Sequence, residues 1–122
     1  MEFVEAPAFT RRVAAYLTDE ELNSLQVCLA LNPQVGDLMV GTGGFRKMRW
    51  ADSRRGKGRR GGLRIIYYYF SSDHQIWLMT VYAKNEASDL TMQQKKVLKG
   101  AIEAELAERA ANKKAGPRTS EG

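Results

Sequence analysis

Five cationic and aromatic side chains lie near the ends of three apolar segments in the middle of the chain. Lys47 and Arg49 alternate with apolar residues in FRKMRWA, Arg64 opens LRIIYYYF, and Tyr82 and Lys84 close IWLMTVYAK. Side chains two residues apart on a β-strand point to the same face of the sheet. If the apolar side chains of these strands all face helices, the five polar side chains converge on the opposite face.

Such a cluster suits a phosphodiester. Cations neutralise the non-bridging oxygens, and more strongly when charge builds up in a transition state. A tyrosine can stack on a base or hold a hydroxyl, and a lysine whose pKa is lowered by like charges can transfer protons. RNA supplies its own nucleophile, the 2′-hydroxyl, so this chemistry requires no metal or other cofactor. The pattern by itself favours passive nucleic-acid binding over cleavage.

The excess of positive charge is concentrated in one segment. The formal net charge is +5 at pH 7, and nine basic residues with a single acid, Asp52, lie between Arg46 and Arg64. A local positive field of this kind is typical of a surface that binds nucleic acid. Beside the cluster, the residues expected to bind RNA or the ribosome are Arg46, Arg54, Arg55, Lys57, Arg59 and Arg60.

The three apolar segments predict strands joined by short or flexible loops, which favours an antiparallel meander. LRIIYYYF lacks polar alternation after Arg64, so it is expected to be a central strand covered on both faces. On the last strand, strict alternation places Trp77 and Met79 on the face opposite Tyr82. His74 falls in the turn before that strand, where a structural role is expected.

Helices are predicted before and after these strands along the chain. One is expected within Ala8–Leu17, and a second starts at the capping box of Thr18 and stops at Pro33. A last helix starts at a similar box at Thr91, with an apolar stripe suited to packing on the sheet. The sequence therefore predicts one α+β domain over residues 1–111, followed by a disordered polar tail over 112–122.

Cysteine usage and hydropathy point to a cytoplasmic protein without membrane contact. Cys28 is the single cysteine and is expected to be a small buried hydrophobe, and zinc-ligand spacings are absent. No run of about 18 apolar residues occurs, and the N-terminal segment lacks the features of an export signal.

Three segments resemble the HigB-like branch of the RelE/ParE superfamily, bacterial toxins of type II toxin-antitoxin systems. They are GTGGFRKMRWA, GGLRIIYYYF and VYAKNEASDLTMQQKK, and the likeness extends roughly from Phe3 to Arg109. It implies a compact RelE-like α+β fold, with N-terminal helices and a C-terminal helix on a curved, mainly antiparallel sheet whose concave face binds RNA.

The resemblance also implies an activity. Toxins of this branch cleave mRNA in the ribosomal A site by attack of the 2′-hydroxyl on the adjacent phosphate, which makes them metal-independent endoribonucleases that inhibit translation. It implies phosphate stabilisation by Lys47, Arg49 and Arg64. It implies base stacking or 2′-hydroxyl orientation by Tyr82, and proton transfer by Lys84 or Lys47. The implied partners are the ribosome, with its 16S rRNA and bound mRNA, and a HigA-like helix-turn-helix antitoxin through which operator DNA is bound.

Some features depart from relatives. Some use a histidine or glutamate as base, whereas the only histidine here is expected in a turn. Glu86 could orient Lys84, although a capping or solvated role is favoured. The basic insert from Ser53 to Gly62 is longer than the tight turn of minimal relatives, and it is expected to bind ribosomal RNA electrostatically. ParE-like gyrase poisons share the fold, so gyrase poisoning and passive ribosome or RNA binding stay open as alternatives.

Overall fold

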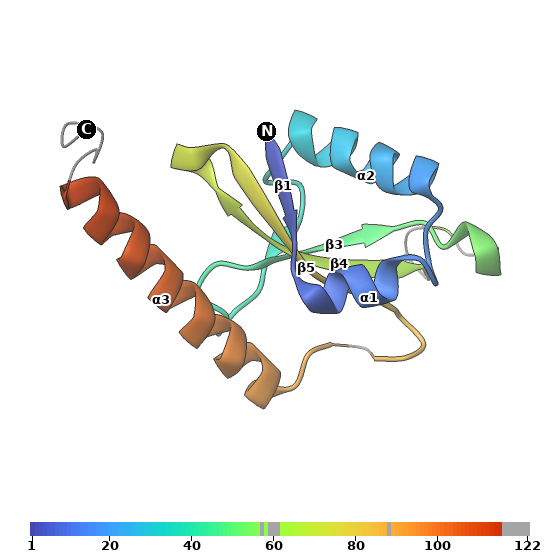
Figure 1. Ribbon diagram of the computed structural model, residues 1–122. Helices are drawn as coiled ribbons and strands as arrows, with labels where there is room; N and C mark the ends of the chain where they lie inside the picture. Colours follow the sequence, from blue (N-terminus) through green and yellow to red (C-terminus); the bar gives the residue numbers. More distant parts are fainter. Residues whose placement is uncertain (57, 59–61, 88, 116–122) are drawn as a thin grey trace.

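The computed structural model describes residues 1–56, 58, 62–87 and 89–115. Three α-helices and five β-strands follow one another along this part of the chain (Figure 1). In order they are β1 (Glu2–Glu5), α1 (Pro7–Val13), α2 (Asp19–Leu31), β2 (Asp37–Leu38), β3 (Arg46–Trp50), β4 (Leu63–Phe70), β5 (Gln75–Ala83) and α3 (Met92–Ala115), with short 3-10 helices η1 (Ser53–Arg55) and η2 (Ser71–Asp73). The α+β class predicted from the sequence is confirmed.

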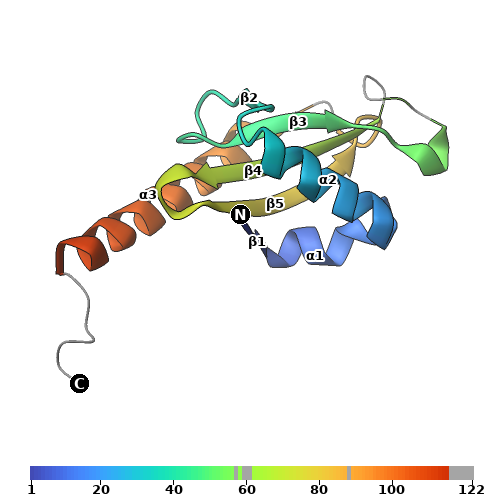
Figure 2. The ribbon, with the colours of Figure 1, turned by 90° about the horizontal axis from the view of Figure 1, so that it is seen from above.

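The strands form one mixed sheet in the order β1-β5-β4-β3-β2. β1 runs parallel to β5, and the remaining neighbours are antiparallel. Figure 2 shows β3, β4 and β5 side by side as the long central strands. The antiparallel meander expected from the three apolar segments is therefore confirmed, whereas the pairing of β1 and the short β2 were not predicted.

The two N-terminal helices cover one face of the sheet. Phe9 of α1 and Leu25 and Leu29 of α2 are fully buried in a cluster that also contains Ile65 and Leu78 from the two central strands. Burial of this aliphatic and aromatic surface supplies the main driving force for folding. Apolar side chains dominate this face, whereas Lys47, Arg49, Arg64 and Tyr82 lie on the other face.

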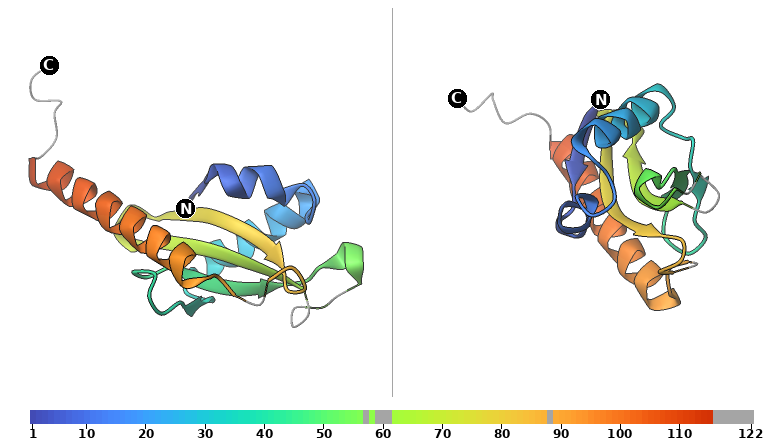
Figure 3. Two further views of the ribbon diagram at one scale, coloured as in Figure 1. Left: turned by 90° about the horizontal axis from the view of Figure 1, so that it is seen from below. Right: turned by 90° about the vertical axis from the view of Figure 1, so that its right-hand side faces the viewer.

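The C-terminal helix lies on that other face, opposite α1 and α2 (Figure 3). Ile102 of α3 is fully buried in a second cluster with Ile66, Phe70 and Tyr82. The expectation that all helices pack against the face away from Tyr82 was therefore wrong. A central strand that is apolar on both faces needs cover on both, and α3 provides the second layer.

A β-bulge in β5 changes which side chains share a face. The register pairs Ile66 with Thr80 but Tyr67 with Leu78, so Met79 is the extra residue. Trp77 and Met79 consequently pack against the second cluster, the one that contains Tyr82. The prediction that they point away from Tyr82 was wrong, because strict alternation does not hold across a bulge.

The predicted helix starts are confirmed in atomic detail. Thr18 and Glu21 exchange the two hydrogen bonds of a capping box at α2, and Thr91 and Gln94 do the same at α3. α3 continues through Ala115, so the predicted tail is helical over its first four residues, and residues 116–122 lie outside the described part. His74 occupies the turn that was expected, with a left-handed backbone at φ 48°.

Among the described residues, no helix combines the length and the apolar character that crossing a bilayer requires.

Candidate nucleic-acid interface

Arg49, Arg64 and Tyr82 form one row across the three central strands. Arg49 of β3 pairs with Arg64 of β4, and Arg64 pairs with Tyr82 of β5. Directly paired residues present their side chains on the same face at close spacing. Lys47 lies two residues before Arg49 on β3, so it shares this face. The register therefore brings together four of the five residues selected from the sequence, as alternation predicted.

The fifth residue, Lys84, follows directly after β5. Its backbone N–H donates to the carbonyl oxygen of Gly62 at 3.0 Å, which fixes its backbone beside the start of β4. Its side chain is exposed. Lys84 thus lies at the margin of the row, two residues beyond Tyr82.

The row is unusual for a folded sheet because one of its charged side chains, that of Arg64, is buried. Arg64 is only 5% exposed, and it lies directly opposite the exposed Arg49. Like charges in directly opposed positions destabilise a strand pair. The Arg64 guanidinium donates to the carbonyl oxygen of Leu63 at 3.2 Å. A phosphate bound beside the two arginines would form charge-assisted hydrogen bonds with them.

The Tyr82 hydroxyl lies within this row and is itself buried. Tyr82 is 5% exposed, and its hydroxyl makes no hydrogen bond within the described part of the chain. Burial, assisted by the charge of Asp89 and opposed by that of Arg64, raises the pKa of this phenol above its ordinary value. The hydroxyl is therefore neutral at physiological pH, and no described residue accepts its proton.

Lys47 is held by an acid that the sequence did not point to. Its ammonium lies 3.3 Å from Asp89, and Lys95 of α3 lies 3.3 Å from the other oxygen of the same carboxylate. Burial opposes ionisation of Asp89, but the Leu90 N–H and the two lysines outweigh it and hold the pKa of the carboxyl below its ordinary value. Asp89 therefore joins β3 to α3 and neutralises part of the cationic face.

Glu86 closes the turn after β5. Its carboxylate accepts from the Ala83 N–H at 2.8 Å and from the Tyr16 hydroxyl, and it lies 3.5 Å from Arg12 of α1. These contacts confirm the capping role that was favoured for Glu86. The turn that carries Lys84 is therefore anchored to the helical layer.

Two of the six predicted RNA-binding residues use their guanidinium groups within the protein. Arg46 donates to the carbonyl oxygen of Gly36 at 2.7 Å, and Arg54 donates to that of Ala14 at 2.7 Å. The backbone of Arg55 lies in η1. The other three residues, Lys57, Arg59 and Arg60, lie outside the described residues.

The base of the basic loop is narrow, and this keeps β3 and β4 in register next to the row. Gly62 is buried there, and a Cβ atom at this position would collide with the carbonyl oxygen of Trp50. The absence of a side chain therefore lets the two ends of the loop approach closely.

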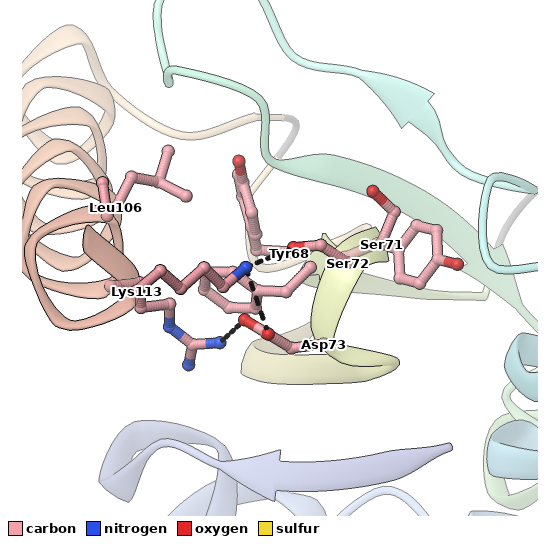
Figure 4. Close-up of a pocket in the computed structure, with 10 residues that line it drawn as sticks. Tyr68, Ser71, Ser72, Asp73, Leu106 and Lys113 are labelled. Atoms are coloured by element: carbon pink, nitrogen blue, oxygen red, sulfur yellow. Dashed lines mark hydrogen bonds and ion pairs between the residues drawn. The ribbon is translucent and has the colours of Figure 1, made fainter. Parts of the chain in front are cut away.

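A separate hollow of about 250 Å³ lies between η2 and the last turns of α3. Figure 4 shows Lys113 reaching from α3 toward Ser72 and Asp73. Lys113 donates to Ser72 at 3.0 Å and lies 3.4 Å from Asp73, which also pairs with Arg109 at 2.8 Å. The hydrogen bond that the Arg109 guanidinium donates to Asp73 holds the pKa of this carboxyl below its ordinary value. These charges bind one another and hold the end of α3 on the β4–β5 turn.

No known protein-family model matches the chain.

Proposed function

We propose that the protein is a HigB-like toxin, a metal-independent endoribonuclease that cleaves mRNA in the ribosomal A site and so inhibits translation in the cytoplasm. The observation that supports this proposal is the row of Arg49, Arg64 and Tyr82, in which two cations and a neutral phenol lie side by side on one sheet face. A gyrase poison or a passive RNA-binding protein has no evident need for a buried phenol hydroxyl beside paired arginines.

In the proposed reaction, the 2′-hydroxyl of one nucleotide attacks the adjacent phosphorus. A bond forms between the 2′-oxygen and phosphorus, and the bond from phosphorus to the 5′-oxygen breaks. The products are a 2′,3′-cyclic phosphate and a 5′-hydroxyl end. A base must take the proton of the 2′-hydroxyl, and an acid must give one to the departing 5′-oxygen.

The side chains of the row fit these tasks. Arg49 and Arg64 would stabilise the charge that accumulates on the non-bridging oxygens. The Tyr82 hydroxyl, which makes no hydrogen bond with a described residue, would donate to the 2′-oxygen or another RNA oxygen. Because Lys47 is already paired with Asp89, the exposed Lys84 is the better candidate for proton transfer.

The proposal also names partners. The ribosome would present the mRNA strand, and a HigA-like helix-turn-helix antitoxin would neutralise the toxin and carry any contact with operator DNA. Co-expression of a small helix-turn-helix protein encoded beside this one should then restore growth, and the two proteins should copurify.

The decisive experiment is induction in bacteria followed by mapping of mRNA 5′ ends. A ribosome-dependent nuclease leaves new ends in phase with codons. The exposed Arg49 tests the site without disturbing the core, so Arg49→Gln should abolish these ends while thermal unfolding is unchanged. Arg64→Gln should also abolish these ends, and Arg11→Gln, on the exposed surface of α1, provides a charge-matched control that keeps activity.

Two other outcomes would contradict the proposal. Growth arrest with intact mRNA and accumulating cleaved DNA would indicate gyrase poisoning. Ribosome binding with neither effect would indicate a passive module, and the row would then bind phosphate without promoting its cleavage.

A further inference from the structure

The first half of α3 carries a second cationic surface. Residues 92–102 contain three lysines and no acid, whereas residues 103–115 contain three acids and three basic residues. The positive charge of the helix is thus concentrated in its N-terminal half, where the helix dipole adds a partial positive charge. An evenly solvated helix would more often intersperse both signs.

The three lysines line a hollow with apolar side chains. The hollow has a volume of about 400 Å³ and is lined by the residues that we call the α3 lysine surface: Val40, Gly41, Met92, Lys95, Lys96 and Lys99. Val40 is 89% exposed and Met92 is 78% exposed, so two large apolar side chains are exposed to solvent beside the lysine ammonium groups. This combination suits a single nucleic-acid strand, since phosphates pair with lysines while sugars or bases contact apolar atoms.

This surface is continuous with the candidate site. Asp89 contacts Lys47 of β3 and Lys95 of α3 at 3.3 Å each, so the two lysines bind the two oxygens of the same carboxylate. Lys47 is in turn two residues from Arg49 along β3, about 7 Å at the rise of a strand. Cations therefore follow one another from Arg64 to α3 at short steps, as a phosphate backbone requires.

We propose that the RNA strand which the row of Arg49, Arg64 and Tyr82 accepts continues over the α3 lysine surface. The lysines there bind backbone phosphates outside the cleaved bond, and the contact is independent of base sequence. This inference rests on the proposed function, because it assigns the path of the substrate strand beyond the same site. Charge complementarity and continuity with the row select RNA as the occupant.

The test uses Lys96→Gln/Lys99→Gln, which removes two cations without touching the Asp89 ion pairs. Arg11→Gln/Lys114→Gln is the matched control, because it removes two exposed cations elsewhere and changes the net charge equally. The probes are a 2′-O-methyl oligonucleotide of about ten nucleotides, which cannot undergo 2′-hydroxyl attack, and a trinucleotide of the same chemistry. Binding is measured over a series of salt concentrations.

The lysine variant should bind the long probe more weakly, and its slope of log affinity against log salt should fall by about 1.4, at about 0.7 for each lost phosphate contact. The trinucleotide should bind unchanged, since it fills only the row. Equal losses in the control variant, an unchanged long-probe affinity, or a loss seen only with ribosomes would overturn the inference.

The two proposals fail differently. If Arg49→Gln abolishes cleavage while the lysine variant binds like the wild type, only the path over α3 is refuted. If the wild type cleaves no mRNA yet binds the long probe in a lysine-dependent manner, the nuclease proposal is refuted and the RNA path stands.

Discussion

Two buried tyrosines on neighbouring strands offer a paired test of which hydroxyl serves the fold and which serves RNA. The Tyr67 hydroxyl donates to the Pro33 carbonyl oxygen at 2.8 Å and accepts from the Gly36 N–H at 2.9 Å. The Tyr82 hydroxyl makes no hydrogen bond with any described residue. Burial raises the pKa of both phenols, so both are neutral at pH 7.

The two Tyr→Phe changes should therefore have opposite effects. Tyr67→Phe leaves the buried Gly36 N–H without its acceptor, which costs about 1–3 kcal/mol. For a domain of this size that corresponds to a fall in Tm of about 4–12 °C. Tyr82→Phe removes a buried hydroxyl without breaking a hydrogen bond to a described residue, so the free energy of unfolding should stay the same or rise.

Thermal unfolding and the rate of mRNA cleavage measure the two effects. Tyr82→Phe should lower cleavage by at least about tenfold at unchanged Tm, because a group that donates to the reacting RNA contributes in this range or above it. Tyr67→Phe should lower Tm and leave cleavage near the wild-type rate at temperatures where the variant is folded. A Tyr82→Phe variant that unfolds as early as Tyr67→Phe, or cleaves like the wild type, would refute this division of roles.

Three further changes test other parts of the structure. Because the pKa of Asp89 is lowered in the fold, its stabilising contribution is present above about pH 4 and is lost as pH falls through the folded-state pKa. Asp89→Asn should flatten the acid limb of a pH–stability curve, and it should raise RNA affinity at low salt by freeing two lysines; unchanged affinity would argue against a shared cationic face. Gly62→Ala places a methyl group against the Trp50 carbonyl oxygen and should lower Tm with loss of cleavage, whereas normal unfolding would show that the loop base is not tightly packed. Arg109→Lys keeps the charge but loses a guanidinium that lies 3.8 Å from the Phe70 ring centroid, so urea unfolding should show a loss of about 0.5–1 kcal/mol, and no loss would exclude stacking as a source of stability.

Local sequence rules predicted much of the site because its geometry depends on short-range periodicity. Lys47 and Arg49 share a face through alternation alone, and the capping box at Thr91 fixed where α3 begins. The end of α3 was placed too early because ANKK is polar. Alanine and lysine are good helix formers, however, and Lys113 also pairs with Asp73.

Features of the site that depend on long-range packing could not be predicted from the sequence. The bulge at Met79 depends on how β5 fits β4, and no local signal distinguishes it from regular alternation. The pairing of Asp89 with Lys47 joins residues far apart in the chain, and it exists only because α3 crosses the sheet on the face of the row. If α3 packed on the other face, Asp89 would not lie between Lys47 and Lys95.

The row differs from the rest of the described fold in how a buried hydroxyl group is hydrogen-bonded. Another buried hydroxyl, that of Thr42, both donates to the Met39 carbonyl oxygen at 2.8 Å and accepts from the Phe45 N–H at 3.1 Å. Among the described buried side chains, the Tyr82 hydroxyl alone makes no hydrogen bond, and it lies beside a buried arginine that opposes a second arginine. Costs of this kind are expected at sites that a ligand completes. We therefore expect the Tyr82 hydroxyl to gain a hydrogen-bond acceptor when RNA binds at the row.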